Sequence, residues 1–154
     1  MKKLFAMLLW VALLGMAITS CGDDKDEPQP EPTQQLESAH EQETDRYLVF
    51  DIDLDKDSSS IYFYNIVFTI GEVESPAMNI RIDAPVTVDK TGKIYTYQGT
   101  GIMPYMLRGN TPVPMPGEAY QVTDLLCHVN TDAKTFDIKF DCHGGHFENS
   151  GRLK

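Results

Sequence analysis

A period of two in the apolar residues is the feature of this chain that most restricts its fold. From Tyr47 onward, short runs rich in Ile, Val, Tyr, Phe and Thr are separated by Gly, Pro, Asn and Asp. In two of them, LVFDIDLDKD from Leu48 and FDIKFD from Phe136, apolar side chains alternate with charged ones. Successive side chains of a strand point to opposite faces, so each of these runs has one buried and one solvent-facing side. No run keeps helical spacing, and the sequence therefore predicts an all-β fold.

About eight strands with short connections are expected. Residues 89–92 (DKTG) place Gly92 where a tight turn needs a positive φ, and residues 130–133 (NTDA) close a hairpin. Connections this short imply antiparallel neighbours, so we expect a single antiparallel meander that packs as a sandwich or closes into a barrel. The expected strands cover residues 46–54, 61–70, 78–83, 85–89, 93–98, 101–107, 119–130, 134–141 and 145–153, of which 78–83 and 85–89 are readable as one strand bent at Pro85.

The N-terminus has the pattern of a secretory signal peptide, predicted here for residues 1–20. Three residues that include Lys2 and Lys3 precede an apolar stretch from Leu4 to Ile18. As a helix this stretch would cover about 22 Å, less than the ~30 Å of a bilayer core. Residues 18–21 (ITSC) resemble a bacterial lipobox, which implies that Cys21 is acylated and anchors the mature chain to a membrane. An ordinary signal peptide with an incidental cysteine is the alternative.

The segment that follows the cysteine, residues 21–45, is predicted to be a disordered linker. Between Gly22 and Asp45 it has nine acidic residues, one lysine, three prolines and only Leu36 as a large apolar residue. Such a segment buries too little surface to offset the entropy of ordering. The remainder, residues 46–154, is long enough for one domain and has fourteen acidic and ten basic residues. No basic patch is present, so binding to nucleic acid is not expected.

Several features follow one another in a characteristic order. After the lipobox and the acidic spacer come an apolar strand with Asn65, Ile66 and Phe68, the residues Pro76, Ile80 and Ile82, the strand Val86-Thr87-Val88, a proline-rich loop, residues 120–125, a hairpin, and a last strand with Phe147 and Gly151. In this order the chain resembles the calycin-like β-barrel lipoproteins of Bacteroidota. The resemblance implies a calycin- or lipocalin-like barrel that binds a small hydrophobic or amphipathic ligand. It also implies that residues 23–27 (DDKDE) direct the protein to the cell surface, lipid-anchored in the outer membrane; a merely solvated spacer is the alternative.

The candidate ligand-binding residues come from strands whose faces are both apolar and from a Met-Tyr segment. In residues 61–70 (IYFYNIVFTI), both faces are largely apolar, so one of them meets a loop or a ligand. Residues 110–117 (NTPVPMPG) form a stiff loop whose Met115 suits adaptable apolar recognition or, alternatively, caps the barrel. The candidate lining residues are Tyr62, Tyr64, Phe68, Tyr95, Tyr97, Tyr105 and Met106.

Metal binding and catalysis find little support. Residues 51–57 (DIDLDKD) are similar to a calcium loop but have Lys56 in place of its glycine. Cys127 and His128 are neighbours on a strand and face opposite sides, which leaves a zinc site only if His143 and His146 converge. There is no GxSxG motif and no cofactor motif, so we expect a non-enzyme that needs no cofactor.

The two cysteines of the domain are expected to be thiols. A turn centred on residues 131 and 132 would place Cys127 opposite Phe136, about 20 Å along the ladder from Cys142. A disulfide would need a different register or a bulge.

Two functions from different classes remain open. The first is a surface lipoprotein whose barrel binds a small hydrophobic or amphipathic ligand. The second is a non-catalytic structural or interaction module of the cell envelope that presents a loop or an edge strand to a protein or glycan. A cavity would favour the first and a filled core the second.

Overall fold

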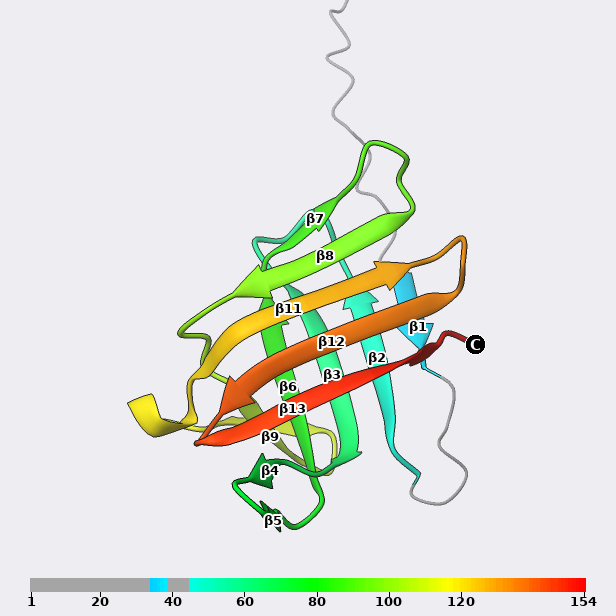
Figure 1. Cartoon of the computed structure of the whole chain (residues 1–154). Helices are drawn as coiled ribbons and strands as arrows, with labels where there is room; N and C mark the ends of the chain where they lie inside the picture. Colours follow the sequence, from blue (N-terminus) through cyan, green and yellow to red (C-terminus); the bar gives the residue numbers. More distant parts are fainter. Residues whose placement is uncertain (1–33, 39–44) are drawn as a thin grey trace, which may run out of the picture.

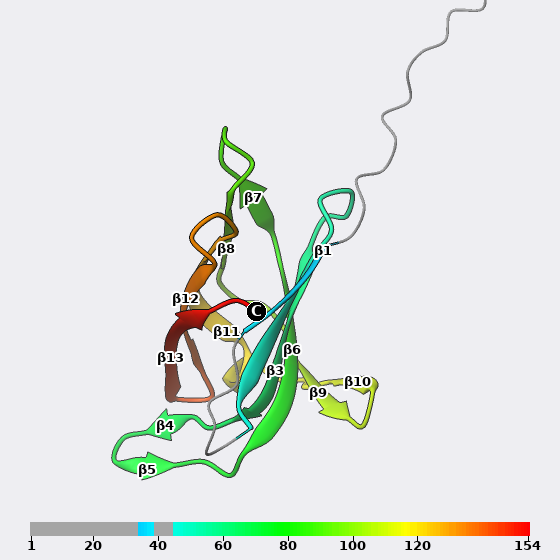
Figure 2. The same cartoon turned by 90° about the vertical axis from the view of Figure 1, so that its right-hand side faces the viewer.

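The computed structural model describes residues 34–38 and 45–154, which form two antiparallel sheets packed face to face (Figures 1 and 2). The first sheet has the order β1 (Gln34–Glu37), β2 (Tyr47–Ile52), β3 (Ser59–Ile66), β6 (Met78–Ala84), β9 (Tyr105–Arg108) and β10 (Thr111–Pro114). The second has the order β5 (Val73–Glu74), β4 (Thr69–Ile70), β13 (Gly145–Arg152), β12 (Thr135–Cys142), β11 (Val122–Asn130), β8 (Ile94–Gly99) and β7 (Val86–Val88). One turn of 3₁₀ helix, η1 (Glu118–Tyr120), precedes β11.

The all-β, antiparallel prediction is confirmed, whereas the expected closed barrel is not found among the described strands. The order also differs from a simple meander, since β6 pairs with both β3 and β9 and β4 pairs with β13. No helix in the described ranges is long and apolar enough to cross a membrane. The predicted signal peptide, Cys21 and most of the predicted linker lie outside the described residues.

Three chain segments of the described range pass from the first sheet to the second, β3–β4, β6–β7 and β10–β11, and the first two turn at Asn65 and Pro85. A bulge interrupts the pairing of β3 with β6, where Asn65 has a φ of 53° and its backbone N–H donates to Asn79 Oδ1 at 2.7 Å. Bulges bend a strand, and Asn tolerates a positive φ, so the chain turns here from β3 into β4. Pro85 lies between β6 and β7. Residues 78–83 and 85–89, which were readable as one bent strand, thus form two strands that belong to different sheets.

The described strands begin at Gln34, earlier in the chain than residue 46, where the composition predicts the folded domain to begin. β1, within the range assigned to the linker, pairs with β2 as an edge strand, and Leu36 lies opposite Phe50 and packs against the core. Next to it, the buried Ser38 accepts a hydrogen bond from the Leu48 N–H at 2.7 Å and forms a bridge with Leu153 after β13. Edge pairing uses backbone groups, and one apolar side chain is enough to dock the strand, which explains why composition gave no signal.

Aromatic side chains from both sheets fill the space between them. Phe50 of β2 lies 5.4 Å from Phe136 of β12, and Phe63 of β3 lies 5.4 Å from Phe140 and 5.5 Å from Phe147, measured between ring centroids. All five are buried. The middle of the sandwich is thus a packed core.

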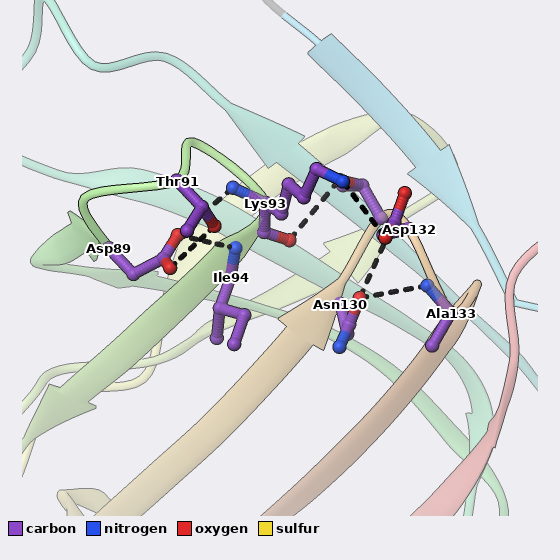
Figure 3. Close-up of polar contacts among 8 residues, drawn as sticks. Asp89, Thr91, Lys93, Ile94, Asn130, Asp132 and Ala133 are labelled. Carbon is purple, nitrogen blue, oxygen red and sulfur yellow. Dashed lines mark hydrogen bonds and ion pairs between the residues drawn. The ribbon is translucent and has the colours of Figure 1, made fainter.

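The two predicted turns correspond to the loops β7–β8 and β11–β12, which lie at the same end of the sandwich, and the first of them forms as predicted. Gly92 has a φ of 71° and its N–H donates to the Asp89 carbonyl at 3.0 Å. Figure 3 shows that the Asp89 carboxylate accepts hydrogen bonds from Thr91 Oγ1 at 2.6 Å and from the N–H groups of Lys93 and Ile94, each at 3.0 Å. Lys93 also pairs with Asp132 of the neighbouring loop at 2.9 Å, which joins the two loops.

We expect the stability that Asp89 contributes to disappear in acid. The hydrogen bond from Thr91, followed by those from the Ile94 and Lys93 N–H groups, holds the pKa of Asp89 well below its usual range. A depressed folded-state pKa stabilises the fold above the unfolded pKa of about 4, and this contribution is lost as the pH falls through the folded pKa. The difference in unfolding free energy between wild type and Asp89→Ala should therefore shrink below about pH 4. Urea unfolding at several pH values measures it; a difference that does not change with pH would contradict this role of the Asp89 carboxylate.

The β11–β12 hairpin has a longer loop than the expected two-residue turn. Asn130 pairs with Thr135, the intervening four residues end with Lys134 at a φ of 53°, and Asn130 Oδ1 accepts the N–H groups of Asp132 and Ala133. This shifts the register, so that Cys127 lies opposite Ile138 rather than Phe136.

Candidate functional site

The predicted lining residues are distributed over three parts of the molecule. Tyr95 and Tyr97 of β8 are buried in the core between the sheets, with exposed fractions of 6% and 0%. Met106 of β9 is half-buried and lies opposite the buried Ile80. Tyr62, Tyr64 and Tyr105 are half-buried on the outer face of the first sheet. Of the seven predicted residues, only Phe68 lines the pocket described next.

The outer face of the first sheet has four half-buried tyrosines, which we call the tyrosine face: Tyr47, Tyr62, Tyr64 and Tyr105. The rings of Tyr47 and Tyr64 stack at 4.4 Å. Arg81 pairs with Tyr62 on one side and Tyr105 on the other, and its guanidinium carbon lies 4.5 Å from the Tyr105 ring centroid. Arg81 also forms a 2.8 Å ion pair with Asp83, which accepts a hydrogen bond from Ser60 Oγ at 2.7 Å.

An apolar pocket of about 390 Å³ lies at the end of the sandwich that carries the β4–β5 hairpin; we call it the end pocket. Its walls come from the hairpin, the start of β6, the segment before η1 and the β12–β13 turn. Its lining residues are Phe68, Ile70, Val73, Glu74, Ser75, Pro76, Met78, Met115, Tyr120, Cys142 and His143. The volume falls within the ~300–1,000 Å³ typical of small-molecule sites.

The β4–β5 hairpin is fixed above the core by Ser75. Its hydroxyl accepts a hydrogen bond from the Phe68 N–H at 2.9 Å and donates one to the Pro76 carbonyl at 3.0 Å, and its own N–H donates to the Phe68 carbonyl at 2.8 Å. The Phe68 ring lies 5.8 Å from Phe140 and 6.2 Å from Phe147. Phe68 therefore belongs to both the aromatic core and the pocket wall.

On the hairpin side of the end pocket, β13 lies in close contact with β4. A Cβ on Gly145 would lie 3.0 Å from Phe68 Cβ and 3.1 Å from Ile70 Cγ1. Such distances are shorter than normal carbon contacts, so a side chain at Gly145 would displace the hairpin. Glycine at this position allows the pocket wall to approach the second sheet.

The opposite wall joins the segment before β11 to the end of β12. The Cys142 thiol donates to the Tyr120 carbonyl at 3.2 Å, and the Tyr120 ring stacks on His143 at 4.5 Å. His143 has a φ of 52° in the β12–β13 turn. Met115, from the predicted proline-rich loop, packs against the core and contributes to this wall. Its N–H donates to the Pro104 carbonyl at 3.0 Å, which holds the loop in place.

The predicted free thiols are confirmed, since neither Cys127 nor Cys142 forms a disulfide. Burial raises the pKa of both thiols. We therefore expect slow alkylation by iodoacetamide in the folded protein, with Cys142, which lines the pocket, reacting before the fully buried Cys127. Intact-mass measurement of the chain from residue 22 should show two alkyl groups after denaturation without reductant. Absence of both groups would demonstrate a disulfide.

The geometry does not support the calcium site or the zinc site that the sequence analysis considered. Within residues 34–38 and 45–154, no group of three His, Cys, Asp or Glu side chains is placed to hold an ion. His143 and His146 do not converge, because His146 Nδ1 lies 2.6 Å from Asp141 Oδ1 while His143 stacks on Tyr120. In the segment similar to a calcium loop, Asp53 forms an ion pair with Lys56, the residue that replaces the glycine.

Sequence reasoning missed most of the pocket. Met115 was recognised from its proline-rich loop, whereas Ile70, Val73 and Met78 had no distinguishing signal. The lining residues come from four separate segments, and only the fold brings them together. Comparison with known proteins adds no further site: no family model, no curated protein and no solved structure matches this chain.

Proposed function

We propose that this protein is a non-catalytic, lipid-anchored envelope protein that binds a small hydrophobic or amphipathic ligand in the end pocket. The observation that carries the proposal is the pocket itself, whose volume of about 390 Å³ and walls of Phe68, Ile70, Met78 and Met115 suit an alkyl chain or a ring. Methionine side chains adapt to different apolar shapes. In support, the core between the sheets is packed with aromatic rings, whereas the end pocket is open, so we assign the ligand to the end of the sandwich.

Membership of the calycin-like β-barrel lipoproteins of Bacteroidota forms part of the same proposal. In support, β3–β4 and β6–β7 carry the chain from one sheet to the other, and the bridge from Ser38 to Leu153 links the sheets at another edge. Such crossing strands are the means by which a two-sheet structure approaches a barrel. Lipidation at Cys21 and display at the outer-membrane surface are proposed from the sequence.

The positions of β1 and the end pocket are compatible with this anchoring. Gln34, the first described residue, pairs with Ile52 at the end of β2, whereas the pocket adjoins β4, which follows the other end of the sheet at Ile66. Figures 1 and 2 show the β4–β5 hairpin at the opposite end from the β7–β8 loop. The N-terminal end of β1, from which the chain would lead back to a lipid at Cys21, is therefore at the opposite end of the described domain from the end pocket.

Binding of the neutral probe N-phenyl-1-naphthylamine tests the proposal. The chain from residue 22, which keeps every described residue, should increase the fluorescence of the probe with saturation at one site. Met115→Trp fills part of the cavity and should weaken binding about tenfold or more, whereas the volume-conserving Met115→Leu should change it by less than about threefold.

The Trp variant carries its own folding control. Trp10 is the single tryptophan of the chain and is absent from the tested protein, so the emission of the new Trp reports whether the ring is buried in the pocket. A folded Met115→Trp protein that binds the probe as wild type does would refute the end pocket as the ligand site.

The tyrosine face supports a second candidate, binding of a glycan by the outer face of the first sheet. Aromatic rings stack on sugar rings, and charged groups beside them can bind hydroxyls. Arg81 and Asp83, whose side chains are partly exposed beside Tyr62 and Tyr105, are the charged groups that would bind sugar hydroxyls there.

Affinity electrophoresis in gels containing soluble cell-surface polysaccharides distinguishes the two candidates. A glycan-binding face predicts retardation that the double replacement of Tyr62 and Tyr105 with Ala removes and that Met115→Trp leaves intact. Equal mobility with and without every polysaccharide tested would reject the second candidate.

A further inference from the structure

The floor of the end pocket holds polar atoms that are already engaged within the protein. Phe68 and Cys142 are the two buried residues of the lining and form this floor. The Ser75 hydroxyl accepts a hydrogen bond from the Phe68 N–H and donates one to the Pro76 carbonyl. The Cys142 thiol donates to the Tyr120 carbonyl. A hydroxyl or charged group of a ligand at this depth would lose its hydrogen bonds to water without an equivalent replacement, which costs free energy.

The two lining residues that can carry charge are placed away from this floor. Glu74 lies opposite Thr69, so the alternation of side chains directs it away from the hairpin face that lines the pocket and toward a separate hollow with Arg46. His143 is exposed, and its ring stacks on Tyr120. Neither side chain therefore brings a charge into the interior of the pocket.

The rim of the pocket is apolar as well. Ile70 and Val73 lie opposite each other on the β4–β5 hairpin, line the pocket, and are 41% and 69% exposed. They are two of the four large apolar side chains that are exposed within residues 34–38 and 45–154. An apolar ligand that passes this rim would cover surface that is otherwise left in water, which adds to its affinity.

The volume of the pocket sets the length of an apolar chain that it can hold. A methylene group occupies roughly the volume of a water molecule, about 30 Å³. The pocket of about 390 Å³ therefore holds on the order of ten methylene groups, which is one alkyl chain of medium length. The flexible side chains of Met78 and Met115 in its walls can adapt to such a chain.

We propose that the end pocket binds the alkyl tail of a single-chain amphiphile end first, with the terminal methyl group on the floor at Phe68 and Cys142 and the head group left in solvent at the rim. The tail supplies the affinity through burial. Selectivity is directed at the tail, because a polar group on its far end would be buried without a partner. The head group adds little discrimination, since water and salt screen its charge. The proposal deepens the proposed function and depends on it.

Two ligands of equal length, 1-decanol and 1,10-decanediol, test which end enters the pocket. Each is titrated within its solubility, at pH 7 and about 0.15 M salt, against the chain from residue 22 loaded with N-phenyl-1-naphthylamine. We expect the diol to displace the probe only at a concentration about tenfold or more above that of decanol, because its second hydroxyl reaches the floor. If the hydroxyl were the end that enters, either end of the diol could do so and the two ligands would displace the probe equally.

Decylammonium and decanoate, each below its micellar concentration, test where the head group lies. In the same medium they should displace the probe at concentrations within about threefold of each other, because a head group in solvent is screened. A larger difference would place the head beside a charged side chain and refute its position in solvent.

The length of the chain tests whether the tail is buried. From 1-hexanol to 1-decanol, the concentration that displaces half of the probe should fall about threefold or more with each added methylene. A concentration that does not change with chain length would show that the tail remains outside the pocket.

Met78, a half-buried lining residue at the start of β6, allows the interior of the pocket to be made polar. Met78→Gln adds an amide that can pair with the second hydroxyl of the diol, and it should reduce the preference for decanol about threefold or more. Met78→Leu has an apolar side chain of similar volume and should keep this preference. A preference unchanged in a Met78→Gln protein whose circular dichroism matches that of wild type would refute burial of the tail here.

The outcomes separate this inference from the proposed function. If neither the naphthylamine probe nor decanol binds, the proposed function fails. If both bind and the diol displaces the probe as well as decanol does, the proposed function stands and binding of the tail end first is refuted.

Discussion

Replacing Phe140 with Ala is expected to lower the free energy of unfolding by about 3–5 kcal/mol. Phe140 of β12 is 1% exposed and its ring centroid lies 5.1 Å from Phe147, 5.4 Å from Phe63 and 5.8 Å from Phe68. Truncation removes apolar burial and leaves a cavity among rings that are held by both sheets, so the site can collapse only partly. Urea unfolding followed by circular dichroism measures the change.

The same strand supplies the control for this prediction. Lys139 precedes Phe140 and points to the solvent side, so Lys139→Ala should change the free energy of unfolding by less than about 0.5 kcal/mol. A loss below about 1 kcal/mol for Phe140→Ala would contradict the packed aromatic core. The variant should also weaken probe binding at the end pocket, because Phe140 supports the ring of Phe68.

In contrast to Phe140→Ala, the replacement Tyr97→Phe is expected to raise the free energy of unfolding, by about 1 kcal/mol. Tyr97 is 0% exposed, and its hydroxyl has no hydrogen-bond partner among the described residues. Burial raises the pKa of this hydroxyl far above its usual value, which expresses the same cost of removing a polar group from water. Removing the oxygen keeps the ring, which lies 6.2 Å from Phe50, and removes the cost.

Tyr95 provides the matched comparison for Tyr97. It lies on the same strand and the same face but retains 6% exposure, so Tyr95→Phe should be close to neutral. Thermal and urea unfolding of both variants give the result. A destabilisation of more than about 1 kcal/mol by Tyr97→Phe would show that the hydroxyl is hydrogen-bonded in solution, for example to an internal water.

The local residue pattern was sufficient to predict the strands but not to predict which strands pair with one another. Strict alternation at Phe136, Ile138 and Phe140 predicted which side faces the core, and these three residues are indeed buried. In residues 61–70 both faces are apolar, and the pattern left open which one is inside. The structure buries Ile61 and Phe63 and places Tyr62 and Tyr64 on the tyrosine face. That choice depends on register against β2 and β6, which a single strand does not encode.

The candidate site was less predictable than the fold for a similar reason. In the sequence, Phe68 was a candidate only as part of an apolar strand and Cys142 was considered only as a thiol, and they join Met115 in one pocket only after the four lining segments pack together. The Cys142 thiol was considered for disulfides and metals, whereas its hydrogen bond to the Tyr120 carbonyl makes it part of a pocket wall. The loop around Met115 was the exception, because its prolines marked it as stiff.

The segments that pass between the sheets, among them those at Asn65 and Pro85, also affect how the molecule assembles. Because β3–β4 and β6–β7 are each continuous along the chain and divided between the sheets, neither sheet can complete its pairing while the other is unfolded. The strand order also pairs segments that are distant in the sequence, as when Ser38 bridges Leu153. Such non-local topologies fold slowly and in one cooperative step. The unfolding transition should therefore have no populated intermediate in which one sheet persists alone.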